Sequence, residues 1–450
     1  MSDVITIRKG LDIPIDGVAA QHVIDKLDIR LYAVKPTDFV GLTPKLLVAE
    51  GDAIKVGDAL FCDKNDERIR FTSPVGGMVK AVVRGEKRKI LEVVVEADGK
   101  IETSEYFGFS ENSEDLKNIM LQCGLWTMLR QRPFGTVANP DDEPKAIFVS
   151  AFSSAPLAPD YDFVMQGRKE FFKKGLEALT KLTKGKVHVC FGHETLGGVM
   201  RDIEQLPTAN CQLPTHYVKG PHPAGNIGTQ IAHIDPINKG DVVWTMNIQD
   251  VAVLGELVST GVYNPEKIIA VAGPNVANPQ YYKVRAGACI KDFGFKENSR
   301  IISGNVLSGN KIESDGFIGA YDDLVSAIPE GDYYDFMGWL MPGVKKFSFS
   351  RTFLSGFLPK LLRWKFDTNT HGDVRPLVFT GYFEKVFPFD IYPTQLIKAC
   401  VIGDIELMEN LGIYEVEPED FALCEFIDVS KTDIQAIVRE ALEKLRKEGV

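Results

Sequence analysis

The sequence predicts a multidomain protein of α/β and β architecture, and the way apolar residues are spaced along the chain is the basis for this fold class. Residues 1–105 carry short apolar runs punctuated by Gly and Pro, as in a β-rich domain. Residues 106–263 alternate continuous apolar runs with helical stretches, which is typical of a doubly wound α/β domain. Residues 264–330 return to short strands, and residues 331–450 are mixed and then helical. A chain of 450 residues is long enough for several such domains.

Composition and charge exclude several classes of protein. A net charge of −11 argues against a nucleic-acid partner, which would need an excess of Lys and Arg. The N-terminus lacks the apolar core of a signal peptide, and no apolar run reaches the ~18 residues needed to span a bilayer. The seven cysteines are widely spaced and include no Cys-x-x-Cys pair. We therefore expect a cytoplasmic chain without disulfides and without an iron–sulfur cluster of its own.

The N-terminal domain is similar to the barrel-sandwich hybrid of biotinyl and lipoyl carrier domains. Two Gly-Asp turns, Gly51-Asp52 and Gly57-Asp58, lead through Ser73–Gly77 into further strands. A carrier domain needs its modified lysine at the tip of a tight hairpin, and Lys64 is the candidate here. Lys64 lies ten residues before Pro74, about two more than the lipoyl pattern has, so we expect an unmodified structural module.

The α/β domain is predicted from three apolar runs, Ala146–Ala151, Val187–Phe191 and Val242–Met246, which suit a parallel sheet covered on both faces. Helices are expected at about Asp162–Leu182 and about Asp250–Ser259. Neither Gly-x-Gly-x-x-Gly nor Gly-x-x-x-x-Gly-Lys-Ser/Thr follows these strands, so the sequence predicts no phosphate-binding loop. The architecture is therefore Rossmann-like without the usual nucleotide signature.

The last two domains are predicted from shorter signals. A β-grasp domain of the soluble-ligand-binding type fits residues 264–330, with strands expected at Lys267–Ala272, Tyr281–Arg285 and Arg300–Ser303. In the C-terminal domain, the clearest helix is Asp433–Lys447, whose apolar residues form one stripe. Thr432 and Gln435 have the spacing of a capping box at its start.

The stretch from Gly220 to Ile237 is rich in residues with special backbone conformations. Its glycines and prolines predict a long shaped loop, neither helix nor strand, at a connection where α/β proteins often bind ligands. The residues with possible ligand or subunit contact are Gly220, His222, Gly225 and Gly228. Five of the seven histidines lie between residues 188 and 233, but their spacing matches no zinc motif. Structural histidines are favoured over a metal site.

Six blocks of sequence carry a family resemblance: GLDIPI (Gly10–Ile15), GLWTMLRQRPF (Gly124–Phe134), KAIFVSAFSSAPLAPD (Lys145–Asp160), GPHPAGNIGTQIAHIDPI (Gly220–Ile237), PTQLIKACVIGDIELMENLGIYE (Pro393–Glu415) and PEDFALCEF (Pro418–Phe426). Together they resemble one family, the A subunit of the bacterial sodium-translocating NADH:quinone oxidoreductase. A more distant similarity is to the C subunit of the Rnf complex and to the NADH-binding subunit of respiratory complex I. The resemblance implies the same order of domains as the apolar patterns do.

The resemblance implies a peripheral subunit on the cytoplasmic face of the bacterial inner membrane. The six-subunit complex oxidises NADH, reduces quinone and exports sodium, and the B subunit in the membrane is the partner expected to lie nearest. The complex I relative binds flavin and NADH with a glycine-rich loop where this chain has bulky Leu125, Trp126, Met128 and Leu129. We therefore expect no redox cofactor in this chain, with FAD, FMN, riboflavin and iron–sulfur held by other subunits.

The resemblance also implies that two segments lie close to quinone, Tyr32–Leu42 and Arg132–Asn139. A quinone ring needs an apolar wall and one or two donors for its carbonyl oxygens. The residues suited to these roles are Tyr32, Phe39, Leu42 and Phe134 for the wall, with Arg130 and Arg132 as donors. Alternatively, the arginines are ion-paired surface residues and Phe39 belongs to the β core.

Two other functions stay open at this point. In one, the chain is a structural docking subunit that closes the quinone site of a membrane partner without touching quinone. In the weaker one, it is an independent soluble flavoprotein dehydrogenase. Titrating quinone into the chain would separate the first alternative from quinone binding, and an absorption spectrum would test the second.

A docking surface is predicted at residues 345–366, where basic and aromatic residues interleave without an acidic residue. The residues expected to meet the membrane partner or lipid are Lys345, Lys346, Arg351, Lys360, Arg363, Trp364 and Lys365. Gly356 and Pro359 disfavour one continuous helix, so the sequence predicts a folded loop with a short helix. A solvated basic face over a local aromatic core is the alternative.

Overall fold

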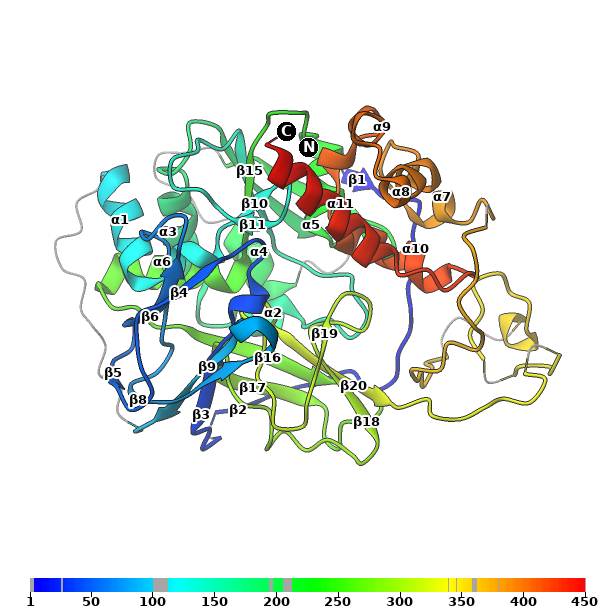
Figure 1. The fold of residues 1–450 in the computed structure, drawn as a ribbon, viewed down its shortest axis with the longest axis horizontal. Helices are drawn as coiled ribbons and strands as arrows, with labels where there is room; N and C mark the ends of the chain where they lie inside the picture. Colours follow the sequence, from blue (N-terminus) through cyan, green and yellow to red (C-terminus); the bar gives the residue numbers. More distant parts are fainter. Residues whose placement is uncertain are drawn as a thin grey trace.

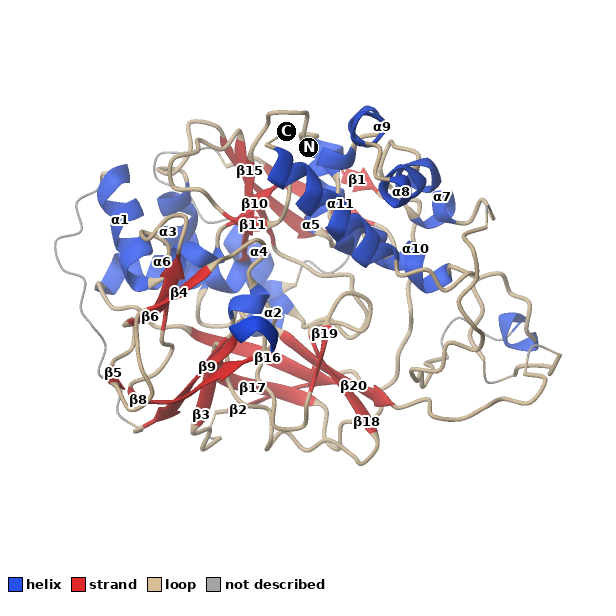
Figure 2. Cartoon of the chain, in the orientation of Figure 1, coloured by secondary structure: helices blue, strands red, loops and turns tan. Residues whose placement is uncertain are grey.

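Figure 1 shows the fold in the computed structural model. The structure describes residues 4–25, 27–99, 112–193, 197–204, 213–338, 340–344, 346–357, 362–378 and 380–449. Within these ranges the strands form four sheets. Figure 2 shows two groups of strands, with most helices gathered around the upper group and along the upper right edge.

The N-terminal sheets have the strand orders β3-β9-β8-β5 and β4-β6-β7. Their strands are β3 (Leu31–Val34), β4 (Pro44–Leu46), β5 (Ala53–Ile54), β6 (Ala59–Asp63), β7 (Arg70–Thr72), β8 (Gly77–Arg84) and β9 (Ile90–Ala97). The rings of Phe61 and Phe71 stack 4.8 Å apart in the core between them. Both predicted Gly-Asp turns are confirmed, because the Asp52 and Asp58 carboxylates each accept a backbone N–H three residues back. Lys64 is exposed in the β6–β7 connection.

The α/β domain contains a sheet of order β1-β14-β13-β12-β15-β10-β11. Its strands are β1 (Val4–Thr6), β10 (Arg130–Arg132), β11 (Thr136–Val137), β12 (Ala146–Ser150), β13 (Lys186–Gly192), β14 (Thr215–Lys219) and β15 (Val243–Asn247). In this sheet, neighbouring strands among β1, β14, β13, β12 and β15 are parallel. The β10–β11 hairpin then pairs antiparallel with β15. The three predicted apolar strands are confirmed as β12, β13 and β15.

The helices of this domain are α1 (Ser113–Cys123), α2 (Tyr161–Val164), α3 (Lys169–Leu179), α4 (Gly198–Glu204), α5 (Ile227–Ile234) and α6 (Ile248–Thr260), with the 3-10 turn η3 (Leu125–Met128). The predicted helix at about Asp162–Leu182 is two helices, because Gly167 adopts φ of 77° between α2 and α3. The helix predicted at about Asp250–Ser259 is confirmed as α6. Helices α3 and α6 pack so closely that a Cβ at Gly255 would lie 1.7 Å from the Phe171 carbonyl oxygen.

The prediction that Gly220–Ile237 contains no helix is wrong, because this stretch contains α5. Ile227, Ile231 and Ile234 recur at helical spacing and pack on the sheet with Phe148 and Val218. The residues before α5 do form turns, and a Cβ at Gly220 would lie 2.2 Å from the Ile7 carbonyl oxygen. An apolar face against the sheet thus outweighs the helix-breaking character of the flanking residues.

The third domain has a sheet of order β19-β18-β20-β16-β17-β2. Its strands are β2 (Ala20–Ile24), β16 (Glu266–Ala272), β17 (Gln280–Arg285), β18 (Ser299–Ser303), β19 (Asn310–Ile312) and β20 (Leu324–Pro329). The three predicted strands are confirmed as β16, β17 and β18. Strands β1 and β2 lie within the span predicted for the N-terminal domain, yet they pair with β14 and β17 of the other two sheets.

The C-terminal domain packs several short helices around a longer one (Figure 1). They are α7 (Phe383–Val386), α8 (Pro393–Ile402), α9 (Ile405–Asn410), α10 (Ala422–Ile427) and α11 (Ile434–Glu448), with the 3-10 turns η5 (Ile413–Glu415) and η6 (Pro418–Phe421). The predicted capping box is wrong, because Asp433 caps α11 at the Ala436 N–H and Gln435 donates to the Leu307 carbonyl oxygen. The apolar stripe of α11 is confirmed by its buried residues.

The described parts of residues 331–378 form an arm between β20 and α7, drawn at the right of Figure 1. Its described part is loop with the 3-10 turn η4 (Leu354–Phe357), as the sequence predicts. Across the described residues of the whole chain, every helix falls short of the length and apolar character needed to cross a bilayer.

Candidate functional site

The two segments predicted to lie near quinone meet in the structure. Val40 forms a parallel β-bridge with Thr136, which joins the turn after β3 to the β10–β11 hairpin. Helix α11 covers both segments. Its Arg439 Nη1 donates to the Phe134 carbonyl oxygen at 2.7 Å, and its Arg446 guanidinium lies against Gly41. Segments about one hundred residues apart in the sequence thus form one surface under the C-terminal helix.

Tyr321 links Phe39 to Arg130 at this junction. The Phe39 and Tyr321 rings meet edge to face with centroids 5.5 Å apart, and the Arg130 guanidinium lies 5.2 Å from the centroid of the Tyr321 ring. The Tyr321 hydroxyl donates to the Thr127 carbonyl oxygen at 2.8 Å. Burial raises the pKa of this hydroxyl, so it stays neutral. Phe39 is therefore both part of the β core and adjacent to Arg130, through a residue that the sequence analysis did not select.

Arg132 lies in a buried cluster of ion pairs with the C-terminal domain. Its guanidinium contacts Glu417 at 3.4 Å, Glu419 at 2.8 Å and Asp420 at 3.1 Å. Arg130 contacts Glu417 at 3.0 Å. The Arg132 side chain is 3% exposed. Both arginines thus have carboxylate partners, as the alternative interpretation expected, but the pairs are buried instead of lying at the surface.

The carboxylates of this cluster have opposite pKa shifts. Burial raises the pKa of Asp420 to about 7, although Arg132 opposes the shift. Burial would also raise the pKa of Glu417, but Arg132, Arg130 and Arg439 together lower it. At neutral pH Glu417 is therefore ionised, whereas Asp420 is divided between its protonated and ionised forms.

The other predicted wall residues lie around this junction. Tyr32 is buried on β3 and bridges to Ala288 of the third domain, and burial raises the pKa of its hydroxyl. Leu42 packs on the core while partly exposed. Phe134 has φ of 84°, which is unusual for a residue with a side chain, and its ring meets Tyr414 edge to face at 6.2 Å.

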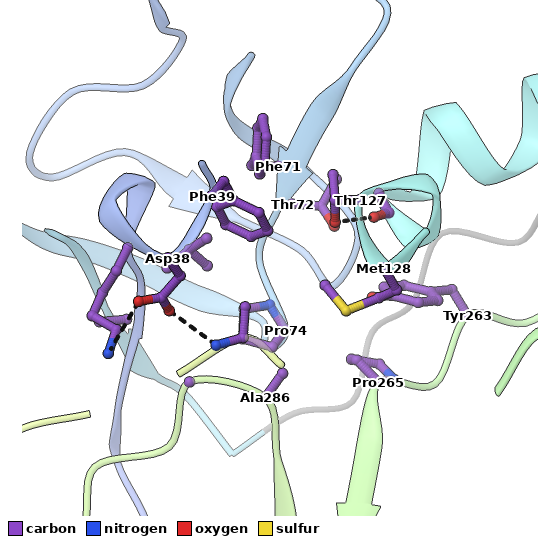
Figure 3. Close-up of a pocket in the computed structure, with 16 residues that line it drawn as sticks. Asp38, Phe39, Phe71, Thr72, Pro74, Thr127, Met128, Tyr263, Pro265 and Ala286 are labelled. Atoms are coloured by element: carbon purple, nitrogen blue, oxygen red, sulfur yellow. Dashed lines mark hydrogen bonds and ion pairs between the residues drawn. The ribbon is translucent and has the colours of Figure 1, made fainter. Parts of the chain in front are cut away.

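A pocket opens beside Phe39 where the three N-terminal domains meet (Figure 3). It encloses about 480 Å³ of empty space, counting the part open to solvent. Figure 3 shows Phe39 and Met128 on opposite sides, with Tyr263 beyond Met128 and Asp38 on the Phe39 side. The residues that line it are Ala33, Val34, Lys35, Asp38, Phe39, Phe71, Thr72, Pro74, Gly124, Thr127, Met128, Tyr263, Pro265, Ala286, Gly287 and Ala320.

Of the residues predicted to contact quinone, Phe39 lines this pocket. Lys35 and Asp38 belong to the predicted segment Tyr32–Leu42 but were not selected, because nothing in their spacing shows that both side chains turn inward. The sequence singles out Met128 only as one of the bulky residues that stand where the complex I relative has its glycine-rich loop. Tyr263 and Ala286 carry no sequence signal, since they reach the pocket from a linker and a strand end of other domains.

The turn before α5 is tied to the connection after β12. His222 is 3% exposed, and its Nδ1 lies 3.1 Å from the Ser154 hydroxyl oxygen. Burial lowers the pKa of His222 to about 4, so the ring is neutral at pH 7. The Gly225 N–H donates to the same Ser154 oxygen at 2.7 Å. A Cβ at Gly228 would lie 2.4 Å from Asp420, so α5 also approaches the ion cluster.

His188 and His216 form a pair on neighbouring strands, with ring nitrogens 2.8 Å apart. Burial lowers the pKa of His188 to about 4, and His216 lowers it further. Within the described ranges, no group of three or more His, Cys, Asp or Glu residues is placed to hold a metal ion.

The predicted docking residues occupy different surroundings. Lys346 pairs with Asp335 within the arm, and the Arg363 guanidinium donates to the Ile15 carbonyl oxygen at 3.3 Å. Trp364 is half-buried and bridges to Ile15. Arg351 and Lys365 are exposed. Lys345 and Lys360 lie outside the described residues.

Three family models match this chain. They are described as the NqrA N-terminal barrel-sandwich hybrid domain, at residues 5–98, the NqrA second alpha/beta domain, at residues 111–263, and the NQRA C-terminal domain, at residues 268–314. The first match confirms the predicted barrel-sandwich hybrid. A much weaker likeness, to the NAD+-reducing [NiFe]-hydrogenase, has 11% identity and a TM-score of 0.39 over 77% of this chain and 67% of that one, too low to support an argument.

Full-length relatives agree with the family models. The chain is 38% identical to proteins from Rhodopirellula baltica, Hahella chejuensis and Yersinia pestis that are named as the A subunit of Na(+)-translocating NADH-quinone reductase. These matches cover 98–99% of this chain and 98–100% of each relative. This chain therefore belongs to the A-subunit family of the Na+-translocating NADH-quinone reductase.

Proposed function

We propose that this chain is the peripheral A subunit of its complex and contributes directly to quinone binding, with quinone reduction coupled to sodium export. The observation that carries the proposal is the aromatic pocket beside Phe39, formed where three domains meet. We also propose that the α/β domain is Rossmann-like and the third domain β-grasp-like. The protein works on the cytoplasmic face of the inner membrane.

The pocket has the composition that a quinone head group requires. Phe39, Phe71, Met128 and Tyr263 offer aromatic and polarisable surface for the ring, which gains stability from apolar burial. Lys35 supplies a donor for a carbonyl oxygen.

The other residues predicted to contact quinone hold the segments around the pocket in place. Tyr32 and Leu42 support the Phe39 segment from the core. Arg130 holds the Tyr321 ring that packs on Phe39, and Arg132 fixes the start of the second segment. Phe134 continues this second segment beneath α11. The chain itself holds no redox cofactor, so electrons reach quinone from flavin and iron–sulfur centres in other subunits.

A bulky substitution in the pocket tests this proposal. Ala286 lines the pocket and is half-buried, so Ala286→Leu would occupy the ligand space without removing a contact. Ala53→Leu on the exposed β5 edge is the matched control. In the assembled complex, a photoreactive quinone analogue should label peptides that contain Phe39 or Met128, and Ala286→Leu should abolish this labelling.

The control variant should be labelled like the parent. Equal labelling of the Ala286→Leu complex, or labelling confined to membrane subunits, would favour a docking subunit that does not touch quinone. An absorption spectrum of the purified chain tests the expected absence of flavin. One equivalent of bound flavin would favour the flavoprotein alternative.

The arm supports docking as a second function of the same chain. Among the described residues, large exposed apolar side chains gather here: Tyr333, Tyr334, Phe336, Met337, Leu340, Met341, Val344, Leu354, Phe357, Leu362, Val374 and Val378. Such a concentration marks an interaction surface. Because the family works in a membrane complex, we assign this arm, with Lys345, Lys346, Arg351, Lys360, Arg363, Trp364 and Lys365, to contact with the B subunit in the membrane.

Apolar removal and charge reversal test the docking proposal separately. Phe336 and Phe357 are 88% and 86% exposed, so changing both to Ser should weaken co-purification with the membrane subunits without unfolding the chain. Reversing Lys360, Arg363 and Lys365 should weaken assembly at low salt and reduce the further loss at high salt, because the attraction that salt screens is removed. Val83→Ser, an exposed apolar residue on β8, is the control. Unchanged assembly in both variants would exclude the arm from the interface.

A further inference from the structure

We propose that Lys35 and Asp38 form the polar end of the pocket, where Lys35 binds a quinone oxygen and Asp38 delivers one of the two protons that reduction requires. This inference rests on the proposed function and adds the residues that do the proton chemistry. Both residues lie in the segment Tyr32–Leu42 that the family resemblance implies to be near quinone, and neither is among the side chains that the sequence selects for the wall or the donors.

The geometry of the pair separates it from an ordinary surface ion pair. Lys35 is 9% exposed, and its Nζ lies 3.5 Å from Asp38 Oδ1 while donating to the Phe317 carbonyl oxygen at 3.0 Å. Asp38 Oδ2 accepts the Ala320 N–H at 2.9 Å. Both side chains line the pocket. An ammonium has three donors, so these two acceptors leave one for a ligand in the pocket.

The energetics of burial favour a functional role. Removing two opposite charges from water costs more than one pair at 3.5 Å returns, and apolar side chains of similar size commonly stabilise such sites better. The pair lies beside the apolar wall of Phe39, so a bound ring would exclude water further and strengthen its electrostatic effect. This cost favours a proton on the Asp38 carboxyl group at rest, and the ion pair with Lys35 forms only when Asp38 gives up that proton.

The proton balance is simple. Quinone accepts two electrons, which come from NADH through the complex, and two protons, which form two O–H bonds. The Asp38 O–H bond breaks as one quinol O–H bond forms, and the second proton comes from water at the other oxygen. Asp38 is left as a carboxylate beside the Lys35 ammonium, which stabilises it until solvent returns a proton.

The environment of Asp38 suits a proton donor. Burial raises the pKa of Asp38, Glu92 on β9 raises it further, and Lys35 and the Ala320 N–H oppose the shift. The charged or titratable groups that face Asp38 are Lys35, Glu92, Tyr321 and Asp322. Burial also raises the pKa of Glu92, which is half-buried and close to Lys35. Glu92 is thus placed to pass a proton from solvent toward the pair.

Asp38→Asn and Lys35→Met in the assembled complex test this inference. With NADH and a short-chain quinone, Asp38→Asn should lower kcat by about 100-fold while KM changes little, and should remove the fall in kcat that the parent shows as pH rises through the raised pKa of Asp38. Lys35→Met should raise the KM for quinone by about 10-fold or more. Asp28→Asn and Lys45→Met, both at exposed ion pairs, are the matched controls.

Lys35→Met leaves Asp38 unpaired, so folding is checked by circular dichroism and by a Lys35→Met/Asp38→Asn double variant without either charge. If the double variant folds and reduces quinone with the parent pH profile, the inference is wrong. Ala286→Leu separates this failure from that of the proposed function. Quinone labelling lost in Ala286→Leu but kinetics unchanged in the pair variants would overturn the inference alone, whereas unchanged labelling in Ala286→Leu would overturn both.

Discussion

Replacing Arg132 with Met should destabilise the chain strongly at neutral pH and much less in mild acid. Arg132 is buried against three carboxylates from the C-terminal domain, of which Glu417 and Asp420 are also buried. The variant keeps the aliphatic volume but leaves Glu417 with Arg130 as its remaining direct partner. A buried charge that loses its main partner escapes by taking up a proton, so the cost depends on pH.

The magnitude follows from the free energy of that protonation. Glu417 has its pKa lowered in the parent, so it contributes stability above its unfolded pKa of about 4.3, and this contribution is lost as pH falls. Keeping it neutral costs about 1.36 kcal/mol per pH unit above that value. The variant should therefore lose up to about 4 kcal/mol at pH 7 and about 2 kcal/mol at pH 5.5. Asp420, with its pKa raised to about 7, adds less because it is already partly protonated.

Urea unfolding followed by tryptophan fluorescence would measure this effect. Trp244 is a suitable reporter, because it is buried and its indole N–H donates to Gln131 of β10 at 3.2 Å. Arg132→Met/Glu417→Gln should recover most of the loss at pH 7. Arg68→Met, at an exposed pair, should leave the midpoint unchanged. A loss that is the same at pH 5.5 and pH 7, or no larger than in Arg68→Met, would refute the reasoning.

Three further substitutions have outcomes fixed by the packing. Gly255→Ala would place a Cβ 1.7 Å from the Phe171 carbonyl oxygen, so α3 and α6 must separate and the thermal midpoint should fall by several degrees; an unchanged midpoint would contradict this contact. Asn247→Ala removes the side chain that accepts an N–H at the start of α6, and urea unfolding should show a loss of about 1 kcal/mol. Gly228→Ala would crowd the Asp420 carboxylate, so hydrogen exchange should speed up in α5 and η6 together and not in α5 alone.

The sequence predicts best where local pattern and tertiary environment agree. Strands β12, β13 and β15 are short continuous apolar runs because both faces of their sheet are covered. This pattern is visible in the residues of each strand alone. The stripe of α11 is clear for a similar reason. The sequence predicts the boundaries of helices less accurately. Gly167 divides one predicted helix, and Asp433, instead of Thr432, caps another.

The parts that could not be predicted depend on contacts between distant residues. Glycines and prolines around α5 indicate a loop, and only the sheet beneath Ile227 and Ile231 makes the helix favourable. Arg132 and its carboxylates are almost 290 residues apart, so their pairing has no local signal. The pocket combines side chains from three domains, and of these the sequence identified Phe39 alone as a ligand-contacting residue.

The pairing of β1 and β2 has a consequence for synthesis on the ribosome. Val4 pairs with Tyr217 and Ala20 with Gln280, so each strand emerges more than 200 residues before its partner. At about 5–20 residues per second, β1 waits roughly 10–40 s and β2 somewhat longer. The barrel-sandwich hybrid that follows them can fold during this interval while both strands stay unpaired. Both strands are short, and β2 carries the polar Gln21 and His22. These features disfavour pairing of the exposed strands with neighbouring nascent chains on a polysome.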